Sequence, residues 1–271
     1  YLRTIPIILP PKEEQQQIYD FIKTHVTQFD SLISKSQSQI TLLQEKRQAL
    51  INHAVTKGLD PNVPMKDSGI EWIGEIPEHW IEIPLKYEYK IQKGKIPSNL
   101  SNEKTEKSIP YLSMDYLRGS SNHIYAKKND GIEVNDNDLL ILWDGSNSGE
   151  ILKSRCGILS STMAVLNQIG DKLDPEYSFY QLKFFEEEIR ANTIGMGIPH
   201  VDGDYIRNLK LILPTKEEQK QIAEFLGKQT AQFDELIAKS KQQITLLEEK
   251  KQALITATVT GKIDVRNGVA A

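Results

Sequence analysis

Residues 1–60 of this chain read YLRTIPIILPPKEEQQQIYDFIKTHVTQFDSLISKSQSQITLLQEKRQALINHAVTKGLD, and the same pattern returns 204 residues later. Residues 205–264 read YIRNLKLILPTKEEQKQIAEFLGKQTAQFDELIAKSKQQITLLEEKKQALITATVTGKID, and 33 of the 60 aligned positions are identical without a gap. Solenoid repeats have periods of roughly 20 to 50 residues, far shorter than this one. The sequence therefore predicts a tandem of large units, each a domain followed by a helix.

Each copy predicts one long helix. In the second copy Pro214 ends the preceding strand, Thr215 can cap the helix, and Glu218 places negative charge in the first turn. Neither copy contains a proline beyond this start, and Gly227 is the one local weak point in the second. We expect helices over 11–60 and 214–264. Helices of roughly 40 residues would be about 60 Å long.

Apolar residues in both predicted helices keep a heptad rhythm. The expected seam consists of Phe29, Ile33, Ile40, Leu43 and Leu50 in the first copy and Phe233, Ile237, Ile244, Leu247 and Leu254 in the second. Polar residues also fall on it, namely Ser36, Arg47, Ser240 and Lys251, and such residues cost stability while fixing register. Since neither helix can bury its stripe alone, we expect the two to pack together as a coiled coil. The alternative is that each helix packs one face on its own globular domain.

Residues 61–213, between the helices, predict one α+β domain. The runs 138–143, 157–166 and 209–213 are apolar and strand-like, while 174–189 carries apolar residues at helical spacing behind an Asp-Pro start. About 150 residues suffice for an independent core.

Composition places the protein among globular chains. Of 271 residues 39% are hydrophobic and 26% charged, and no stretch approaches the roughly 18 apolar residues of a membrane span. Cys156 is the single cysteine, which excludes an internal disulfide and a cysteine-based zinc site and suits a reducing compartment. We expect a cytoplasmic protein.

The formal charge of -4 argues against a uniformly basic nucleic-acid binder. Residues 61–213 are the acidic part, with 17 Lys and Arg against 23 Asp and Glu. Their positive charge is clustered, however, in loops rich in Ser, Asn and Gly, the composition expected where side chains reach phosphate oxygens and base edges. The clusters comprise Lys86, Lys90, Lys93 and Lys95; Arg118 near Asn122 and His123; Lys127 with Lys128; and Lys153 with Arg155. Any DNA contact must come from such local patches.

Signatures of an enzyme are missing from the sequence. It holds neither the Asn-Pro-Pro-aromatic or Asp-Pro-Pro-aromatic motif of a base-flipping methyltransferase nor a Walker lysine motif. The glycine-bearing loop 143–149 reads as a structural or DNA-facing turn, and the five histidines lack metal-ligand spacing. We therefore expect a protein without catalytic residues, metal or cofactor.

Four stretches of this chain together resemble the specificity (S) subunit of type I restriction-modification systems. They are MKDSGIEWIGEIPEHW (65–80), DLLILWDGSNSGE (138–150), GMGIPHVDGDYIRNLKLILPTKEEQKQIAEFL (195–226) and FDELIAKSKQQITLLEEKKQALITATVTGKID (233–264). In that family each of two target recognition domains is followed by a conserved helix, and the helices form an antiparallel coiled coil. The resemblance implies one target recognition domain over 61–213, the last strand of a missing first domain over 1–10, and a tail over 265–271.

The resemblance also implies a non-catalytic reader of double-stranded DNA that recognises one half of a bipartite target. Modification (M) subunits, which carry S-adenosylmethionine, would dock on the helices, and the restriction (R) subunit would bind through M. With one recognition domain missing, two copies could also pair through their helices as a homodimer. An adaptor whose coil assembles proteins without binding DNA stays open, and so does an enzyme with an unrecognised site. The residues expected on the DNA face are Lys93, Lys95, Ser98, Asn99, Arg118, Ser120, Asn122, His123, Lys127, Lys128, Asp144, Ser146, Asn147, Lys153, Arg155 and His200.

Overall fold

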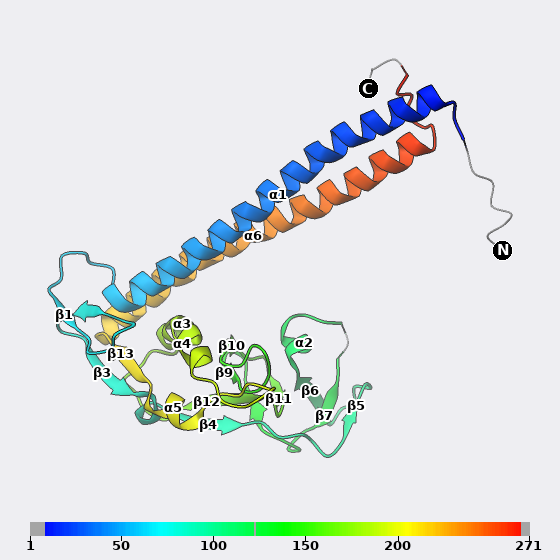
Figure 1. Ribbon diagram of the computed structural model, residues 1–271. Helices are drawn as coiled ribbons and strands as arrows, with labels where there is room; N and C mark the ends of the chain where they lie inside the picture. The colour runs from blue at the N-terminus through cyan, green and yellow to red at the C-terminus, as the bar shows by residue number, and fades with distance from the viewer. Residues whose placement is uncertain (1–8, 122, 267–271) are drawn as a thin grey trace. The chain divides into compact units, whose positions relative to one another are not determined.

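The computed structural model describes residues 9–121 and 123–266 (Figure 1). Contacts divide the chain into two compact units: a coil unit, which joins the described residues up to Arg47 with those from Gln229 onward, and a globular unit, Gln48–Lys228. The expected strand over 1–10 falls largely outside the described residues, and Leu9 and Pro10 belong to no helix or strand. Within the described ranges, no helix combines the length and apolar character needed to cross a membrane.

Two long helices, α1 (Lys12–Lys57) and α6 (Lys216–Val259), begin and end inside the predicted ranges. Helix α6 continues through Gly227. Within the coil unit the two helices lie side by side along their length (Figure 1), so the prediction that they pack together is confirmed.

The packed faces of α1 and α6 follow the heptad pattern. Among the buried residues of the coil unit are Ser36, Ile40, Ile237 and Ser240. The other predicted seam residues of this unit are half-buried, whereas most positions between them are exposed. The expected seam residue Leu50 belongs instead to the globular unit, where it packs against the apolar core.

Two ion pairs show that the helices run antiparallel. Arg47 Nε lies 3.2 Å from Asp234 Oδ1, and Lys251 Nζ lies 2.6 Å from Asp30 Oδ1. Arg47 and Lys251 occupy equivalent positions of the two copies, as do Asp30 and Asp234, so the pairs are related by an approximate twofold axis. The seam is thus filled within one chain, and a homodimer through it would have to replace this pairing.

The globular unit is α+β, as predicted. Its strands are β1 (Met65–Asp67), β2 (Glu75–Pro77), β3 (Ile81–Pro84), β4 (Tyr89–Lys93), β5 (Leu100–Ser101), β6 (Ser108–Leu112), β7 (Tyr125–Lys127), β8 (Glu133–Val134), β9 (Leu139–Leu142), β10 (Ile151–Lys153), β11 (Gly157–Leu159), β12 (Met163–Gln168) and β13 (Lys210–Leu213). Its helices are α2 (Met114–Leu117), α3 (Pro175–Phe184), α4 (Glu186–Ala191) and α5 (Gly203–Asn208), with a 3-10 turn at Leu85–Tyr87.

Two larger sheets and two strand pairs organise these strands. One sheet is antiparallel in the order β10-β9-β12-β4, and the other has the order β5-β7-β6-β11-β8, with β11 parallel to β6. The pairs are β1-β2 and β13-β3. The order joins strands far apart in the sequence, because β4 lies beside β12.

Two predicted segments are divided in the structure. The apolar run 157–166 forms two strands, β11 and β12, separated by Ser160–Thr162 and belonging to different sheets. The helical stretch 174–189 is split into α3 and α4 at Phe185, while Asp174 caps α3 by accepting from the N–H groups of Glu176 and Tyr177. The hydrophobic pattern predicted both segments correctly. It did not predict where they divide, because the residues before and after each break are similarly buried.

The main core lies in the globular unit. Trp80, Tyr177 and Phe185 are its largest fully buried side chains, and Ile51 of α1 and Leu226 of α6 belong to the same cluster. The globular unit therefore includes one end of each long helix. A smaller core lies between the two larger sheets, around Leu140, Met163 and Leu159.

Candidate nucleic-acid interface

The loop Trp143–Glu150 closes the hairpin between β9 and β10 and presents two predicted residues to solvent. Leu142 and Glu150 are paired through the Leu142 N–H to Glu150 O bond of 2.8 Å, and Gly145, at a φ of 110°, allows the chain to turn. Ser146 and Asn147 are exposed at its tip. A hydroxyl and an amide at this position can donate to and accept from base edges.

Three segments meet at the base of this loop. Lys93, at the end of β4, lies 2.8 Å from an Asp144 carboxylate oxygen, and the backbone of Asp144 is paired with that of His200 in an isolated antiparallel β-bridge. The N–H of Gly145 donates to Pro199 O at 2.9 Å. Lys93, Asp144 and His200 are separated by many residues in the sequence, and the structure brings all three together.

A glycine directly after β4 allows this strand to lie close to the turn Ser160–Thr162. A Cβ on Gly94, the residue after Lys93, would lie 2.1 Å from Ser160 O, so a larger residue could not pack there. The Gly94 N–H donates to Met163 O, and the N–H of Trp143 donates to Thr162 O. The turn that divides the run 157–166 therefore serves to hold Lys93 beside the loop.

Arg118 reaches the other end of the loop from α2. Its guanidinium lies 3.0 Å from a Glu150 carboxylate oxygen. Beyond α2, the exposed ring of His123 lies 5.0 Å from the Tyr116 ring and 6.4 Å from the Tyr125 ring. We call the residues around the loop the hairpin cluster; it consists of Lys93, Arg118, Asp144, Ser146, Asn147 and His200.

A second group of predicted residues gathers around Asp130. The N–H groups of Ser98 and Asn99 donate to its carboxylate at 2.9 and 3.3 Å, and the Asp130 N–H donates to Lys127 O. The Ser98 hydroxyl also contacts the Asp130 carboxylate, so this side chain is already engaged within the protein. Lys127 is exposed, as are its neighbour Lys128 and the more distant Lys95.

Lys153 and Arg155 are not brought to the hairpin cluster. Lys153 pairs across the sheet with Leu139, at the end of the hairpin opposite the loop, and forms an ion pair with Glu176 at 2.6 Å. Its ammonium group also lies 4.7 Å from the Phe179 ring centre. Arg155 is exposed, Ser120 is half-buried, and Asn122 lies outside the described residues.

Sequence reasoning missed three features beside the cluster. Trp143 lies beneath Lys93, with 6.0 Å between the ammonium group and the ring centre. Arg190 is exposed at the end of α4, and its backbone N lies 3.3 Å from the position of a Cβ on Gly149. Exposed Met196 and Ile198 occupy the loop before His200. No local pattern marks Trp143 or Arg190, whereas the glycines on either side of Met196 are a usable signal for an exposed tip.

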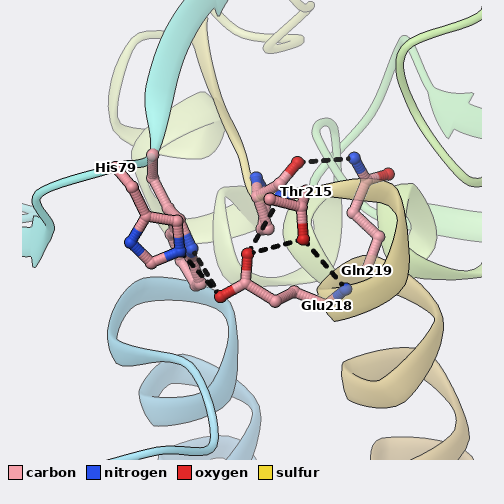
Figure 2. Close-up of polar contacts among 6 residues, drawn as sticks. His79, Thr215, Glu218 and Gln219 are labelled. Atoms are coloured by element: carbon pink, nitrogen blue, oxygen red, sulfur yellow. Dashed lines mark hydrogen bonds and ion pairs between the residues drawn. The ribbon is translucent and has the colours of Figure 1, made fainter. Parts of the chain in front are cut away.

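Residues 77–80, which read Pro-Glu-His-Trp, help to hold the start of α6 (Figure 2). Glu218 accepts from the Thr215 N–H at 3.0 Å and the Thr215 hydroxyl at 2.8 Å, while the Glu218 N–H donates back to Thr215 Oγ1, which makes a capping box. The other carboxylate oxygen lies 2.9 Å from His79 Nε2 and accepts from Trp80 Nε1 at 3.2 Å. Gln219 donates to Pro214 O, as Gln15 does to Pro10 O in the first copy.

Partial burial raises the pKa of Glu218, but the hydrogen bonds from His79, Thr215 and Trp80 outweigh it, so that the pKa lies below its usual value. A pocket of about 450 Å³ adjoins this network and is lined by His79, Glu218 and the chain after α1. Among the described residues, no three His, Cys, Asp or Glu side chains gather in a way that could hold a metal ion. Through its contacts with His79, Trp80 and Thr215, Glu218 joins the start of the domain to α6, and we call these contacts the structural joint.

Comparison with known proteins gives a consistent result. Residues 77–246 match the family described as "Type I restriction modification DNA specificity domain". The chain is similar to the type I restriction enzyme MjaVIII specificity subunit of Methanocaldococcus jannaschii, with 42% identity over 186 residues that cover 68% of this chain and 43% of that relative.

Two solved structures are similar in fold. One is a chain of a type I R-M system studied for its complex assembly and conformational transition, with a TM-score of 0.70, 18% identity, and coverage of 93% of this chain and 60% of that chain. The other is the HsdS subunit from Thermoanaerobacter tengcongensis, with a TM-score of 0.56, 19% identity, and coverage of 95% and 61%. The chain spans about half the length of the curated relatives it matches.

Proposed function

The chain belongs to the type I restriction-modification DNA specificity family, and from that premise we propose that its globular unit reads one half of a bipartite DNA target. The family match carries this proposal, because it covers the domain from Pro77 onward and continues into α6. In this proposal the chain is the specificity component of a complex in which M subunits methylate DNA and the R subunit cleaves it.

The hairpin cluster supports this function by its chemistry. Ser146 and Asn147 offer hydrogen-bonding groups at an exposed tip, and Lys93 and Arg118 offer cations on either side of it. In the free protein these cations are held by Asp144 and Glu150. Phosphate oxygens would compete with the two carboxylates for them, so binding would be weak unless the tip also matched the bases. Because the domain is acidic and these cations are already paired with carboxylates, it should bind DNA of a matching sequence in preference to DNA of any sequence.

The coil unit supports the docking of two alike partners. Within α1 and α6 its exposed leucines are Leu32, Leu42, Leu236 and Leu246, between 46% and 50% exposed. The first two are equivalent to the last two in the repeat. In the heptad that places Ile33 at position a, these leucines take positions g and c, which are adjacent on a helix surface.

All four leucines lie on one flank of the coil. Asp30 and Asp234, which form the interhelical ion pairs, occupy e positions on the other flank. Four exposed apolar side chains related by an approximate twofold axis suit two copies of one partner, and in our proposal these are M subunits. The double variant Leu42→Ser with Leu246→Ser should abolish the complex with M on gel filtration. Gln44→Ser with Glu248→Ser, on the opposite flank, should leave it intact.

The remaining roles belong to the partner proteins. We propose that the chain is non-catalytic and holds no cofactor, that S-adenosylmethionine binds the M subunit, that the R subunit joins through M, and that the complex acts in the cytoplasm. Methylation by the chain alone would contradict this division.

A test of DNA reading uses the full chain with its M subunits and a pool of randomised duplexes. Repeated selection should yield one enriched motif, and its affinity should fall with salt. The matched variants are Asn147→Ala, in the hairpin cluster, and Lys210→Ala, a surface cation on β13 outside it. The first should change the motif and the second should not. If no motif emerges, the adaptor function is favoured, which the acidic domain and the leucine flank would also suit.

A further inference from the structure

The most exposed apolar side chain among the described residues of the globular unit, Met196, lies on a short loop with two further exposed apolar residues. Met196 is fully exposed, Ile198 is 70% exposed and Ile194 is 48% exposed. We call Met196 and Ile198, with Gly195 and Gly197 before each, the apolar tip. Exposing apolar side chains to water is unfavourable. A loop that keeps them exposed is therefore a candidate interaction site.

The turn is built to keep these side chains out. The N–H of Ile194 donates to His200 O at 2.9 Å, and the N–H of His200 donates back to Ile194 O at 2.8 Å, which closes the loop. Gly195 has a φ of 111°, and a Cβ there would lie 2.7 Å from Ile198 O and 2.8 Å from His200 Nδ1. The tip is thus an ordered turn whose conformation requires glycine.

The base of the tip carries polar and charged residues, among them the cations Lys93 and Arg190. This base is joined to the hairpin loop through the Asp144–His200 bridge and the bond from the Gly145 N–H to Pro199 O. Lys93 contacts Asp144, and Arg190 is exposed at the end of the helix that leads into the loop. An apolar projection flanked by cations complements a ligand with apolar faces inside and negative charge outside, which describes the stacked bases and phosphates of duplex DNA.

We propose that Met196 and Ile198 form a wedge that inserts at one base-pair step of the bound duplex. This inference rests on the proposed function. Met, Ile and Pro are side chains that minor-groove proteins place between base steps, which unstacks and kinks the DNA. Pyrimidine–purine steps are the easiest to unstack, so the wedge would create a preference for TA or CA at one position without any hydrogen bond to a base.

The experiment uses the full chain with its M subunits and duplexes selected from a randomised pool. A 2-aminopurine is placed at each step of the selected duplex in turn, and its fluorescence is measured with the wild type, Met196→Ala, Ile198→Ala and Ile169→Ser. Ile169 is the matched control, because it is 62% exposed on a different loop of the same unit.

We expect fluorescence to rise at one step with the wild type and with Ile169→Ser. Met196→Ala should bind about tenfold more weakly and remove the rise, and selection with this variant should lose the preference at that step alone. Wild-type binding without unstacking at any step, or Met196→Ala binding as tightly as wild type, would overturn the wedge and leave DNA reading standing. Loss of M binding by Met196→Ala would also overturn it, in favour of a protein contact. If the wild type selects no duplex, DNA reading and the wedge fail together.

Discussion

Glu218→Ala should destabilise the globular unit far more than its neighbouring substitution Glu217→Ala. The Glu218 carboxylate accepts from Thr215, His79 and Trp80, whereas Glu217 is exposed in the same helical turn. Trp80 is fully buried, so its Nε1–H would lose its partner away from water. That loss costs about 1–3 kcal/mol, and loss of the cap costs about 1 kcal/mol.

We therefore expect Glu218→Ala to lower the free energy of unfolding by about 2–4 kcal/mol. Glu217→Ala removes only a charge favourable to the helix dipole, about 0.3–1 kcal/mol. The assay is equilibrium unfolding in urea followed by tryptophan fluorescence, with the slope compared between variants. If the two variants agreed within about 0.5 kcal/mol, the network would not hold α6 in the way described here.

The difference in unfolding free energy between wild type and Glu218→Ala should become smaller in acid. Hydrogen bonds lower the pKa of Glu218 in the folded protein, so its ionised form adds stability above its unfolded pKa of 4.5. That stability is lost as the pH falls through the folded pKa. The gap between wild type and Glu218→Ala should thus be complete at neutral pH and should narrow below pH 4.5; a gap that widened in acid would contradict the assignment.

Three further tests follow from the structure. Gly195→Ala should lower the free energy of unfolding by about 1–3 kcal/mol, because its Cβ would clash with the turn itself. Gly197→Ala should lower it by less, because a Cβ there would have nothing within 4 Å. Thermal unfolding compares the two variants, and equal losses would refute the close approach at Gly195. Ile40→Ala should lower the free energy of unfolding by about 2–4 kcal/mol, because Ile40 is buried in the coil. Circular dichroism at increasing urea concentrations measures the loss of helix, and an unchanged transition would refute the packing of Ile40 in the seam. Asn147→Ala should change the selected motif, while Lys127→Ala should weaken binding to all duplexes evenly; the reverse pattern would exchange the two roles.

The coil was predictable from the sequence because its determinants are local. A heptad pattern written twice fixes two helices and the faces they share, and Arg47 and Lys251 are among the seam residues it marks. The partners Asp30 and Asp234 could not be assigned, because the pattern of apolar residues does not fix which charged residues lie opposite each other. Antiparallel pairing entered through the family resemblance and is what the ion pairs require.

The candidate interface was predictable only in composition. Lys93, Asp144 and His200 were each expected on the DNA face, but their meeting depends on β4 pairing with β12, which no local period encodes. The structural joint at Glu218 was partly visible as a capping sequence, whereas its contacts with His79 and Trp80 cross well over a hundred residues. Met196 was not predicted at the surface, because apolar residues are usually assigned to cores, and its two neighbouring glycines were a local signal that went unused.

The most direct test of DNA reading is a genome-wide map of methylated adenines in cells that express the chain with its M subunits. We predict one shared motif around the methylated sites, and a different motif when Ser146 and Asn147 are both changed to alanine. Methylated sites without a common motif, or the same motif with both proteins, would contradict the claim that the loop after β9 reads sequence.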